Sequence, residues 1–155
     1  MALEIERKFL LSSDDWRDEV VSSQRMSQGY LCRGDNKAIR VRIAGEVAHL
    51  NIKSTGDGIH RLEFEYAIPL ADARELLDEL ASRPWIDKTR HLVKRGGHTW
   101  EIDEFHAENA GLIVAEIELD HADEAFERPD WLGEEVSQDR RYFNSSLSER
   151  PYNSW

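Results

Sequence analysis

The sequence predicts an α+β fold that is mainly β and is built on an antiparallel sheet. Alternation of apolar and charged residues with a period of two recurs along the 155 residues, which is typical of strands with two different faces. The connections between these stretches are mostly of hairpin length, which favours antiparallel pairing. Segments with helical periodicity are few. Strands therefore dominate the predicted fold.

The first predicted strand, residues 3–9, has the sequence LEIERKF. Its apolar residues share one face, which only Arg7 interrupts. The opposite face carries charges of both signs: Glu4, Glu6 and Lys8. This segment is either an ordinary half-exposed strand or a strand whose charged face meets a ligand that needs both signs.

Three more strands are predicted in the first half of the chain because their apolar and charged side chains occupy opposite faces. They are residues 38–44, 48–54 and 61–68. The run Gly56-Asp57-Gly58 predicts a turn between the last two. A short additional strand is expected at residues 30–33.

Another three strands are predicted after Pro84, and each carries two charges on one face. These pairs are Lys88 and Arg90, Glu101 and Asp103, and Glu116 and Glu118. Gly96-Gly97 is typical of the tight turn of a hairpin, so the first two of these strands are expected to pair.

Four helices are predicted between or after the strands. Ser12 or Ser13 is expected to cap a helix that begins at Asp14 and includes apolar residues at helical spacing, Trp16, Val20 and Val21. The clearest helix precedes Pro84 and has an i, i+3, i+4, i+7 stripe made of Ala73, Leu76, Leu77 and Leu80. Shorter helices are expected at residues 123–126 and 139–147.

Composition limits the classes of function. The length fits one domain, residues 1–155. A net charge of −11 argues against non-specific binding to nucleic acid or to an anionic membrane, although it is compatible with a local basic pocket. No apolar run approaches the roughly 18 residues of a membrane helix, and no signal peptide is visible, so a cytoplasmic protein is expected. A single cysteine, Cys32, excludes an internal disulfide.

Paired carboxylates are the first sign of chemistry. Residues i and i+2 of a strand point the same way, about 6.5 Å apart, so each Glu-x-Glu or Glu-x-Asp pair concentrates negative charge. Like charges this close repel each other, and cations relieve that repulsion. Carboxylate oxygens suit Mg²⁺ or Mn²⁺, whereas the six histidines lack the spacing of a zinc site. The acidic pairs are Glu4 and Glu6, Glu63 and Glu65, Glu101 and Asp103, and Glu116 and Glu118.

Basic residues occupy the same strand faces. Arg-x-Arg on a strand directs two planar guanidinium groups at one place, an arrangement that holds phosphate oxygens. The basic set is Lys8, Arg40, Arg42, Lys53, Arg61, Lys88 and Arg90. So many cations exceed the needs of one phosphate, so a highly anionic ligand that carries metal ions, such as an oligophosphate, is indicated.

Two topologies fit these faces. In an open antiparallel sheet the charged face would simply be solvated. In the other topology the sheet closes into a barrel, the charged faces line the interior, and the helices cover the apolar outside. Barrels of about eight strands can enclose a ligand, and seven or eight strands are predicted. The near-pure acidic or basic character of the faces favours the barrel, but local patterns leave the choice open.

An ordered series of motifs resembles the CYTH superfamily, the triphosphate tunnel metalloenzymes, in its short single-domain bacterial form. The series is Glu4-x-Glu6-x-Lys8 in EIERKF, Arg40-x-Arg42, Lys53 in LNIKS, Glu63-x-Glu65 in LEFEY, Lys88-x-Arg90 in DKTRH, Glu101-x-Asp103 in WEIDEF and Glu116-x-Glu118 in AEIEL. It covers residues 3 to about 147. The resemblance implies an eight-stranded antiparallel tunnel that binds a triphosphate with divalent metal, two ions of Mg²⁺ or Mn²⁺ per site.

The resemblance also implies roles for individual residues. The metal ligands would be Glu4, Glu6, Glu116 and Glu118, with Glu63, Glu65 and Asp103 as further ligands or as neighbours of the ligands. The phosphate-binding residues would be Lys8, Arg40, Arg42, Lys53, Arg90 and Arg61, although Arg61 fits a structural ion pair equally well. Lys88 and Tyr30 are candidates for activating the attacking water, with simple packing as the alternative for Tyr30. Glu101 is expected only to hold a base in place.

The expected function is metal-assisted hydrolysis of a small anionic triphosphate, inorganic tripolyphosphate above all, to pyrophosphate and phosphate. No compact segment indicates a platform for a nucleobase, which favours the smallest substrate. The alternatives are an adenylate cyclase, a nucleoside or thiamine triphosphatase, and a non-catalytic module that binds polyphosphate. A homodimer is a reasonable assembly for a small barrel with an exposed rim.

Overall fold

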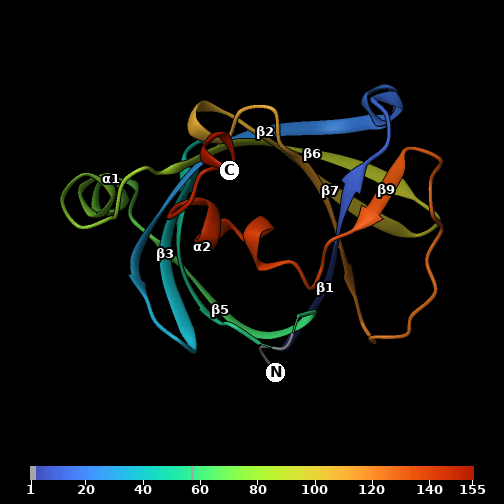
Figure 1. The fold of residues 1–155 in the computed structure, drawn as a ribbon. Helices are drawn as coiled ribbons and strands as arrows, with labels where there is room; N and C mark the ends of the chain where they lie inside the picture. Colours follow the sequence, from blue (N-terminus) through green and yellow to red (C-terminus); the bar gives the residue numbers. More distant parts are fainter. Residues whose placement is uncertain (1–2, 57) are drawn as a thin grey trace.

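Antiparallel strands form a single sheet in the computed structural model, which describes residues 3–56 and 58–155. Within these residues the sheet has nine strands in the order β5-β4-β3-β2-β6-β7-β8-β1-β9, and β5 also pairs with β1. The strands are β1 (Leu3–Leu11), β2 (Val20–Arg33), β3 (Lys37–Ala44), β4 (Val47–Ser54), β5 (His60–Ile68), β6 (Ile86–Arg95), β7 (His98–Phe105), β8 (Ile113–Leu119) and β9 (Leu132–Glu135). The first eight form the closed ring in Figure 1, which confirms the predicted eight-stranded barrel.

Strand β1 closes the barrel and also carries the extra strand. Along one edge it pairs with β8, from Ile5 to Leu10. Along the other edge its beginning pairs with β5, with Leu3 opposite Leu62, and its end pairs with β9, with Phe9 opposite Glu135. The sequence pattern did not predict β9, because this strand is four residues long and sits outside the barrel ring.

The apolar faces of the strands point outward, as the barrel interpretation predicted. The main core lies outside β1, β7 and β8, under a cover that includes the aromatic residues Trp16 and Trp131. Phe9 is fully buried there, and its ring meets Trp100 edge to face at 5.7 Å. Burial of these large side chains supplies most of the apolar area removed from water on this side of the barrel.

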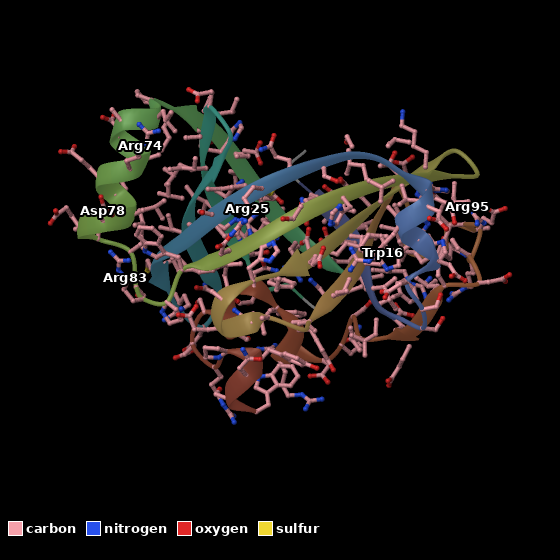
Figure 2. All side chains as sticks on the ribbon, turned by 90° about the horizontal axis from the view of Figure 1, so that it is seen from above. Trp16, Arg25, Arg74, Asp78, Arg83 and Arg95 are labelled. Carbon is pink, nitrogen blue, oxygen red and sulfur yellow. The ribbon has the colours of Figure 1, made fainter. Side chains whose placement is uncertain are left out.

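Helix α1 (Leu70–Glu79) covers a second apolar area, on β3 and β4. Ala73 and Leu77 of the predicted stripe are buried, whereas Leu80 follows the helix and is 64% exposed. Figure 2 shows this helix, with Arg74 and Asp78, at one end of the adjacent strands β2 and β6, and Trp16 at the other end.

The prediction that helices cover the outside was wrong for β5. Its outward residues Leu62, Phe64 and Tyr66 are 43–55% exposed, and α1 does not extend over them. The barrel is therefore covered on two sides only.

The C-terminal segment, residues 140–148, packs at one end of the barrel rather than on its outer surface. It contains a 3-10 helix (Arg140–Tyr142) and the short helix α2 (Asn144–Leu147), and it crosses the ring in Figure 1. Leu147 is fully buried among lumen-facing apolar residues that lie beyond the charged positions of the same strands. These are Leu10, Ile86, Phe105 and Val114. One end of the barrel is thus closed by an apolar layer.

Three predicted helices differ from the structure. The segment from Asp14 forms only a 3-10 helix (Asp15–Glu19), since Val20 begins β2, which pairs with both β3 and β6 and absorbs the predicted strand 30–33. Residues 123–126 are not helical, because Phe126 instead packs on Phe9 and Trp100.

The helix predicted at 139–147 is interrupted at Phe143, whose ψ of 139° is extended.

The turn Gly96-Gly97 is confirmed, with both φ angles positive, as a type I′ hairpin requires. Of the other predicted turn, Asp57 lies outside the described residues. No helix in the described part of the chain is long and apolar enough to span a membrane.

Two phenylalanines on the outer faces of the neighbouring strands β1 and β5 test whether the core lies outside the barrel at β1. Phe9→Ala should lower the free energy of unfolding by about 3–5 kcal/mol, because it leaves a cavity in the core. Phe64→Ala, the matched control at a position that is 43% exposed, should cost less than about 1 kcal/mol. Denaturant titration of both variants measures the difference, and equal losses would contradict the assignment of the core to the outside of β1.

Candidate functional site

The inner faces of the eight barrel strands surround a cavity of about 240 Å³, and those of every strand except β2 contribute charged residues to it. It contains every residue predicted for the site except Asp103. Its charged lining is Glu4, Glu6, Lys8, Arg40, Arg42, Lys53, Arg61, Glu63, Glu65, Lys88, Arg90, Glu101, Glu116 and Glu118, and Tyr30 also lines it. The barrel therefore brings together residues that are up to 114 positions apart in the sequence, as between Glu4 and Glu118.

Strand register explains how half of these charges can share one interior. Acid stands directly opposite base at several positions: Lys8 and Glu116, Glu4 and Arg61, Lys53 and Glu63, and Arg90 and Asp103. Opposite charges at such cross-strand positions attract each other, and the pairing offsets the cost of removing them from water. Lys8 Nζ, for example, lies 2.7 Å from Glu116 Oε1.

At two positions the register places acid opposite acid, namely Glu6 with Glu118 and Glu101 with Glu116. Oxygens of Glu6, Glu101 and Glu116 lie within 4.8 Å of one another. Burial, and next the charge of Glu116, raise the pKa of Glu6 to about 7. Glu116 itself keeps a low pKa, because Lys8, Arg90 and Lys88 outweigh the effect of its burial. A cation at this position would remove the repulsion, and clustered carboxylate oxygens fit a hard divalent ion.

Glu101 belongs to this acidic group, beyond the role predicted for it. It accepts a hydrogen bond from Arg90 at 2.8 Å, as expected for a residue that holds a base, but it also contributes to the three-carboxylate cluster. The Glu-x-Asp pattern was the available signal. Only the structure separates its two acids by depth: Asp103 is fully buried behind Lys88 and Arg90 and is absent from the cavity lining.

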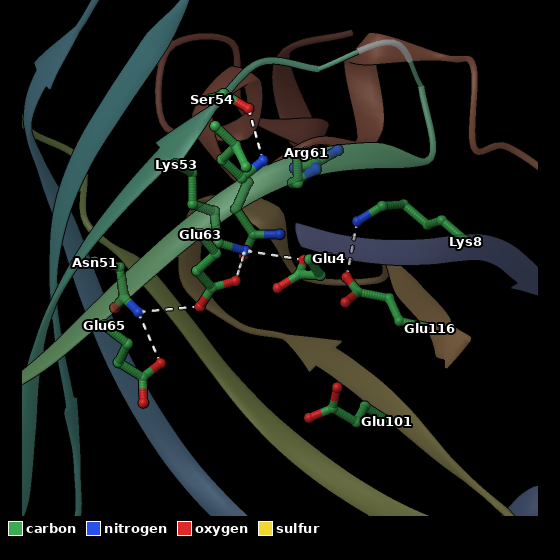
Figure 3. Close-up of polar contacts among 12 residues, drawn as sticks. Glu4, Lys8, Asn51, Lys53, Ser54, Arg61, Glu63, Glu65, Glu101 and Glu116 are labelled. Carbon is green, nitrogen blue, oxygen red and sulfur yellow. Dashed lines mark hydrogen bonds and ion pairs between the residues drawn. The ribbon is translucent and has the colours of Figure 1, made fainter. Parts of the chain in front are cut away.

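Glu4 and Glu63 form a second acidic pair around Lys53, as Figure 3 shows. Burial and a hydrogen bond with Glu63 raise the pKa of Glu4 to about 8. The pKa of Glu63 is instead lowered, because the hydrogen bond from Glu4 and the charge of Lys53 outweigh its burial. Among the described residues, Glu4 Oε1 is buried without a hydrogen-bond partner, and its ion pair with Lys53 Nζ is long, at 3.7 Å. A carboxylate oxygen held this loosely beside a cavity is a further feature that fits a cation.

Several bases have no carboxylate across the strand pair. Arg40 faces Asn51 and Tyr30, and Arg42 faces Gln28 and His49. Burial, with the nearby charges of Arg40 and Arg90, lowers the pKa of Arg42 to about 9. Positive charge that the protein leaves uncompensated here attracts an anionic ligand.

Lys88 and Tyr30, the two residues predicted to activate the attacking water, both line the cavity. Lys88 is 1% exposed, and its Nζ lies 2.7 Å from Asp103 Oδ2. Burial lowers the pKa of Lys88 to about 7. The charge of Asp103 opposes this shift, whereas the charges of Arg90 and Arg42 add to it. Tyr30 is 4% exposed, and the guanidinium carbon of Arg33 lies 5.9 Å from the centre of its ring.

Sequence reasoning missed the neutral polar residues of the site. Asn51 is fully buried and donates hydrogen bonds to Glu63 at 3.3 Å and Glu65 at 2.8 Å. Gln28, Asn144 and Ser145 also belong to the interior or its closed end. Gln28 lies two positions before Tyr30, and Asn51 lies two positions before Lys53. Each of the two residues therefore shares a strand face with a predicted site residue, so its face was predictable. Asn144 gave no comparable signal, because its position depends on how the C-terminal segment packs.

Comparisons with known proteins agree with this geometry. A family model described as the CYTH domain matches residues 2–152. An inorganic triphosphatase of Acetivibrio thermocellus is 43% identical over 155 residues, which is 100% of this chain and 99% of that protein. An inorganic triphosphatase of Nitrosomonas europaea is 34% identical and covers 94% of this chain and 96% of its own. A crystal structure of an inorganic triphosphatase superposes with a TM-score of 0.69 at 32% identity, over 96% of this chain and 95% of the other.

The raised pKa values of Glu4 and Glu6 predict how stability depends on pH without divalent cations. Both pKa values lie above the ordinary 4.5, so the folded chain binds more protons than the unfolded chain between about pH 5 and 8. The free energy of unfolding should therefore fall as the pH rises from about 5 to 7, and the fall should level off above pH 7, where the lowered pKa of Lys88 has the opposite effect. The lowered pKa of Glu63 acts only below about pH 4.5 and adds no slope here.

Thermal unfolding in EDTA, with Glu6→Gln beside the unsubstituted chain, measures this effect. The amide mimics the protonated acid, so the variant should be the more stable one at pH 8, by on the order of 3 kcal/mol for the shift of Glu6. The two should converge at pH 5. Glu46→Gln, in an exposed turn, is the control and should leave the slope unchanged. If the stability of Glu6→Gln depended on pH as steeply as that of the unsubstituted chain, the result would contradict the burial of Glu6 beside another negative charge.

Proposed function

The chain belongs to the CYTH domain family, and on that premise we propose that residues 1–155 form a single-domain triphosphatase that hydrolyses inorganic triphosphate to pyrophosphate and phosphate. The observation that carries the proposal is the barrel cavity of about 240 Å³ with a lining that includes seven basic residues. Pockets for drug-sized ligands have volumes of about 300–1,000 Å³. A smaller cavity with this charge favours a compact oligophosphate, and relatives that match over nearly their whole length are inorganic triphosphatases.

The acidic cluster supports a divalent-metal requirement. Glu6, Glu101 and Glu116 would hold an ion such as Mg²⁺ or Mn²⁺, with Glu4 and Glu118 completing the ligands for two ions per site. When bound, such an ion neutralises phosphate charge and lowers the pKa of a coordinated water. Glu65 and Asp103 would act on the neighbouring side chains, since Glu65 accepts from Asn51 and Asp103 from Lys88 and Arg90.

The basic residues of this chain would bind and orient the substrate. Arg40 and Arg42 offer guanidinium groups that no carboxylate neutralises across the strand, and Lys8, Lys53, Arg61 and Arg90 add positive charge around the cavity. Fixed cations of this kind stabilise the charge that develops on the transferred phosphoryl and on the leaving pyrophosphate.

Proton transfer is assigned to Lys88. With a pKa of about 7, its Nζ is partly neutral at pH 7, so it can accept the proton of the attacking water at a terminal phosphorus. Tyr30 would help to orient this group from the adjacent strand, β2, which pairs with β6. A cytoplasmic location and a homodimer stay predictions of the sequence.

A panel of substrates tests the function. Tripolyphosphate, ATP, thiamine triphosphate and pyrophosphate are each supplied with Mg²⁺ or Mn²⁺, and phosphate, pyrophosphate and cyclic AMP are measured together. Tripolyphosphate should be hydrolysed fastest, with loss of activity in EDTA. Formation of cyclic AMP and pyrophosphate from ATP would instead identify a cyclase. Binding without turnover of any substrate would identify a non-catalytic module.

Removal of single carboxylates tests the metal assignment. Glu6→Gln and Glu118→Gln should each lower kcat by about 10²–10³-fold, because the site loses charge that stabilises the transition state through the metal. Both variants should remain folded, and Mg²⁺ should raise the melting temperature of the unsubstituted chain more than theirs. Glu46→Gln serves as the exposed control. Turnover of Glu6→Gln at the unsubstituted rate would refute the assignment.

A further inference from the structure

We propose that Asn144 and Gln28 are positioning residues for the reaction, which hold the side chains of Lys88 and Arg42 at the cavity; this inference rests on the function proposed above. Neither residue belongs to the charged motifs of the strands. Both act through a neutral carboxamide, and together they connect two bases that lie on different strands, Lys88 on β6 and Arg42 on β3.

A continuous set of hydrogen bonds links the four side chains. Gln28 on β2 stands directly opposite Arg42 and is fully buried. Arg42 Nε donates to Gln28 Oε1 at 3.0 Å, and Gln28 Nε2 donates to Asn144 Oδ1 at 2.8 Å. Lys88 Nζ donates to the same oxygen of Asn144 at 3.0 Å. Because Asn144 Oδ1 receives both donors, the orientation of its carboxamide is fixed.

These bonds define where the Lys88 ammonium can lie. Lys88 has three N–H donors, and Asp103 and Asn144 each accept one of them. The remaining position, which holds an N–H in the ammonium and the lone pair in the neutral amine that accepts a proton, is left for the cavity, which Lys88 lines. Without Asn144 the ammonium would be held by Asp103 alone, at the end of a flexible four-carbon chain. Displacement of a reacting group by about 1 Å can cost about 10²-fold in rate, so the second acceptor matters for turnover.

Neutral acceptors also preserve the charge that the substrate needs. Lys8 and Arg90 are paired with carboxylates, which neutralise them. Arg42, in contrast, bonds to the amide oxygen of Gln28, which orients the guanidinium without cancelling its charge. A carboxylate at position 144 would accept from Lys88 and Gln28 equally well but would repel an oligophosphate. The carboxamides therefore position the side chains of Lys88 and Arg42 without adding negative charge to the cavity.

A purely structural role for Asn144 would be to begin or anchor helix α2. Among the described residues, the hydrogen bonds of the Asn144 side chain go to Gln28 and Lys88, and the anchor of the helix is Leu147, which is fully buried. The polar end of Asn144 is instead directed at residues of β2 and β6. Its contacts are thus with the bases of the site rather than with the segment that carries it.

Four variants test the inference by steady-state kinetics with tripolyphosphate and Mg²⁺. Asn144→Leu and Gln28→Met keep the size of each side chain but remove the acceptor, and each should lower kcat by about 10–100-fold. The double variant should lose no more than the larger single loss, because the two residues act as one unit. Asn144→Asp keeps both acceptor contacts, but its charge beside Lys88 Nζ favours the ammonium. Its kcat should therefore recover to within about 3-fold only at a higher pH, where Lys88 loses its proton, while KM rises through repulsion of the substrate. Ser146→Ala, on the same helix, is the control and should match the unsubstituted chain.

The result that overturns the inference is an unchanged kcat and KM in Asn144→Leu, or fully additive losses in the double variant. A lower melting temperature with unchanged kinetics would also overturn it. Calorimetric binding of tripolyphosphate in EDTA keeps the two proposals apart, and Asn144→Leu should weaken it about 10-fold. An unsubstituted chain that binds but does not turn over would refute the proposed function, and the weaker binding of Asn144→Leu would still support positioning. Equal binding of the two chains would refute positioning.

Discussion

Closure of the sheet through the pairing of β1 with β5 is the constraint on which the rest of the molecule depends. It encloses fourteen acidic and basic side chains in one cavity, where each of them has lost part of its hydration. Isolated charges are costly in such a place, so the interior must be organised as pairs. The register of the strands provides part of this pairing, because Glu4, Glu63 and Glu116 each stand opposite a base on the neighbouring strand.

The functional properties arise where this pairing fails. Acid faces acid between β1 and β8 and between β7 and β8, which concentrates negative charge on one side of the cavity. Bases face neutral residues between β2, β3 and β4, which leaves positive charge on the other side. The surplus of acidic residues favours the binding of a cation, and the surplus of basic residues favours the binding of an anion. A metal-bound oligophosphate satisfies both at once, so substrate and metal complete an electrostatic balance that the chain leaves open.

An interior made of charges requires the apolar core to lie elsewhere. The main core is on the outer face of β1, β7 and β8, and α1 covers β3 and β4, whereas β5 stays largely uncovered. At one end of the barrel, apolar residues turn inward and pack against Leu147. The same segment carries Asn144 to Lys88, so the closure of the barrel and the positioning of a reactive group are coupled through one short stretch of chain.

The sequence by itself determined which side chains share a strand face, because alternation along an extended strand is a local property. It therefore predicted the acidic and basic residues of the cavity, and the ordered motifs resembled a known family closely enough to give the barrel. It did not determine that Val20 continues as a strand, that Asp103 lies behind Lys88 while Glu101 reaches the cavity, or that Asn144 meets Gln28. These depend on pairing and packing between segments far apart in the chain, and burial of an apolar residue such as Leu147 demands a partner without specifying which one. Only the tertiary structure decides that, because many distant contacts compete and the fold satisfies them together.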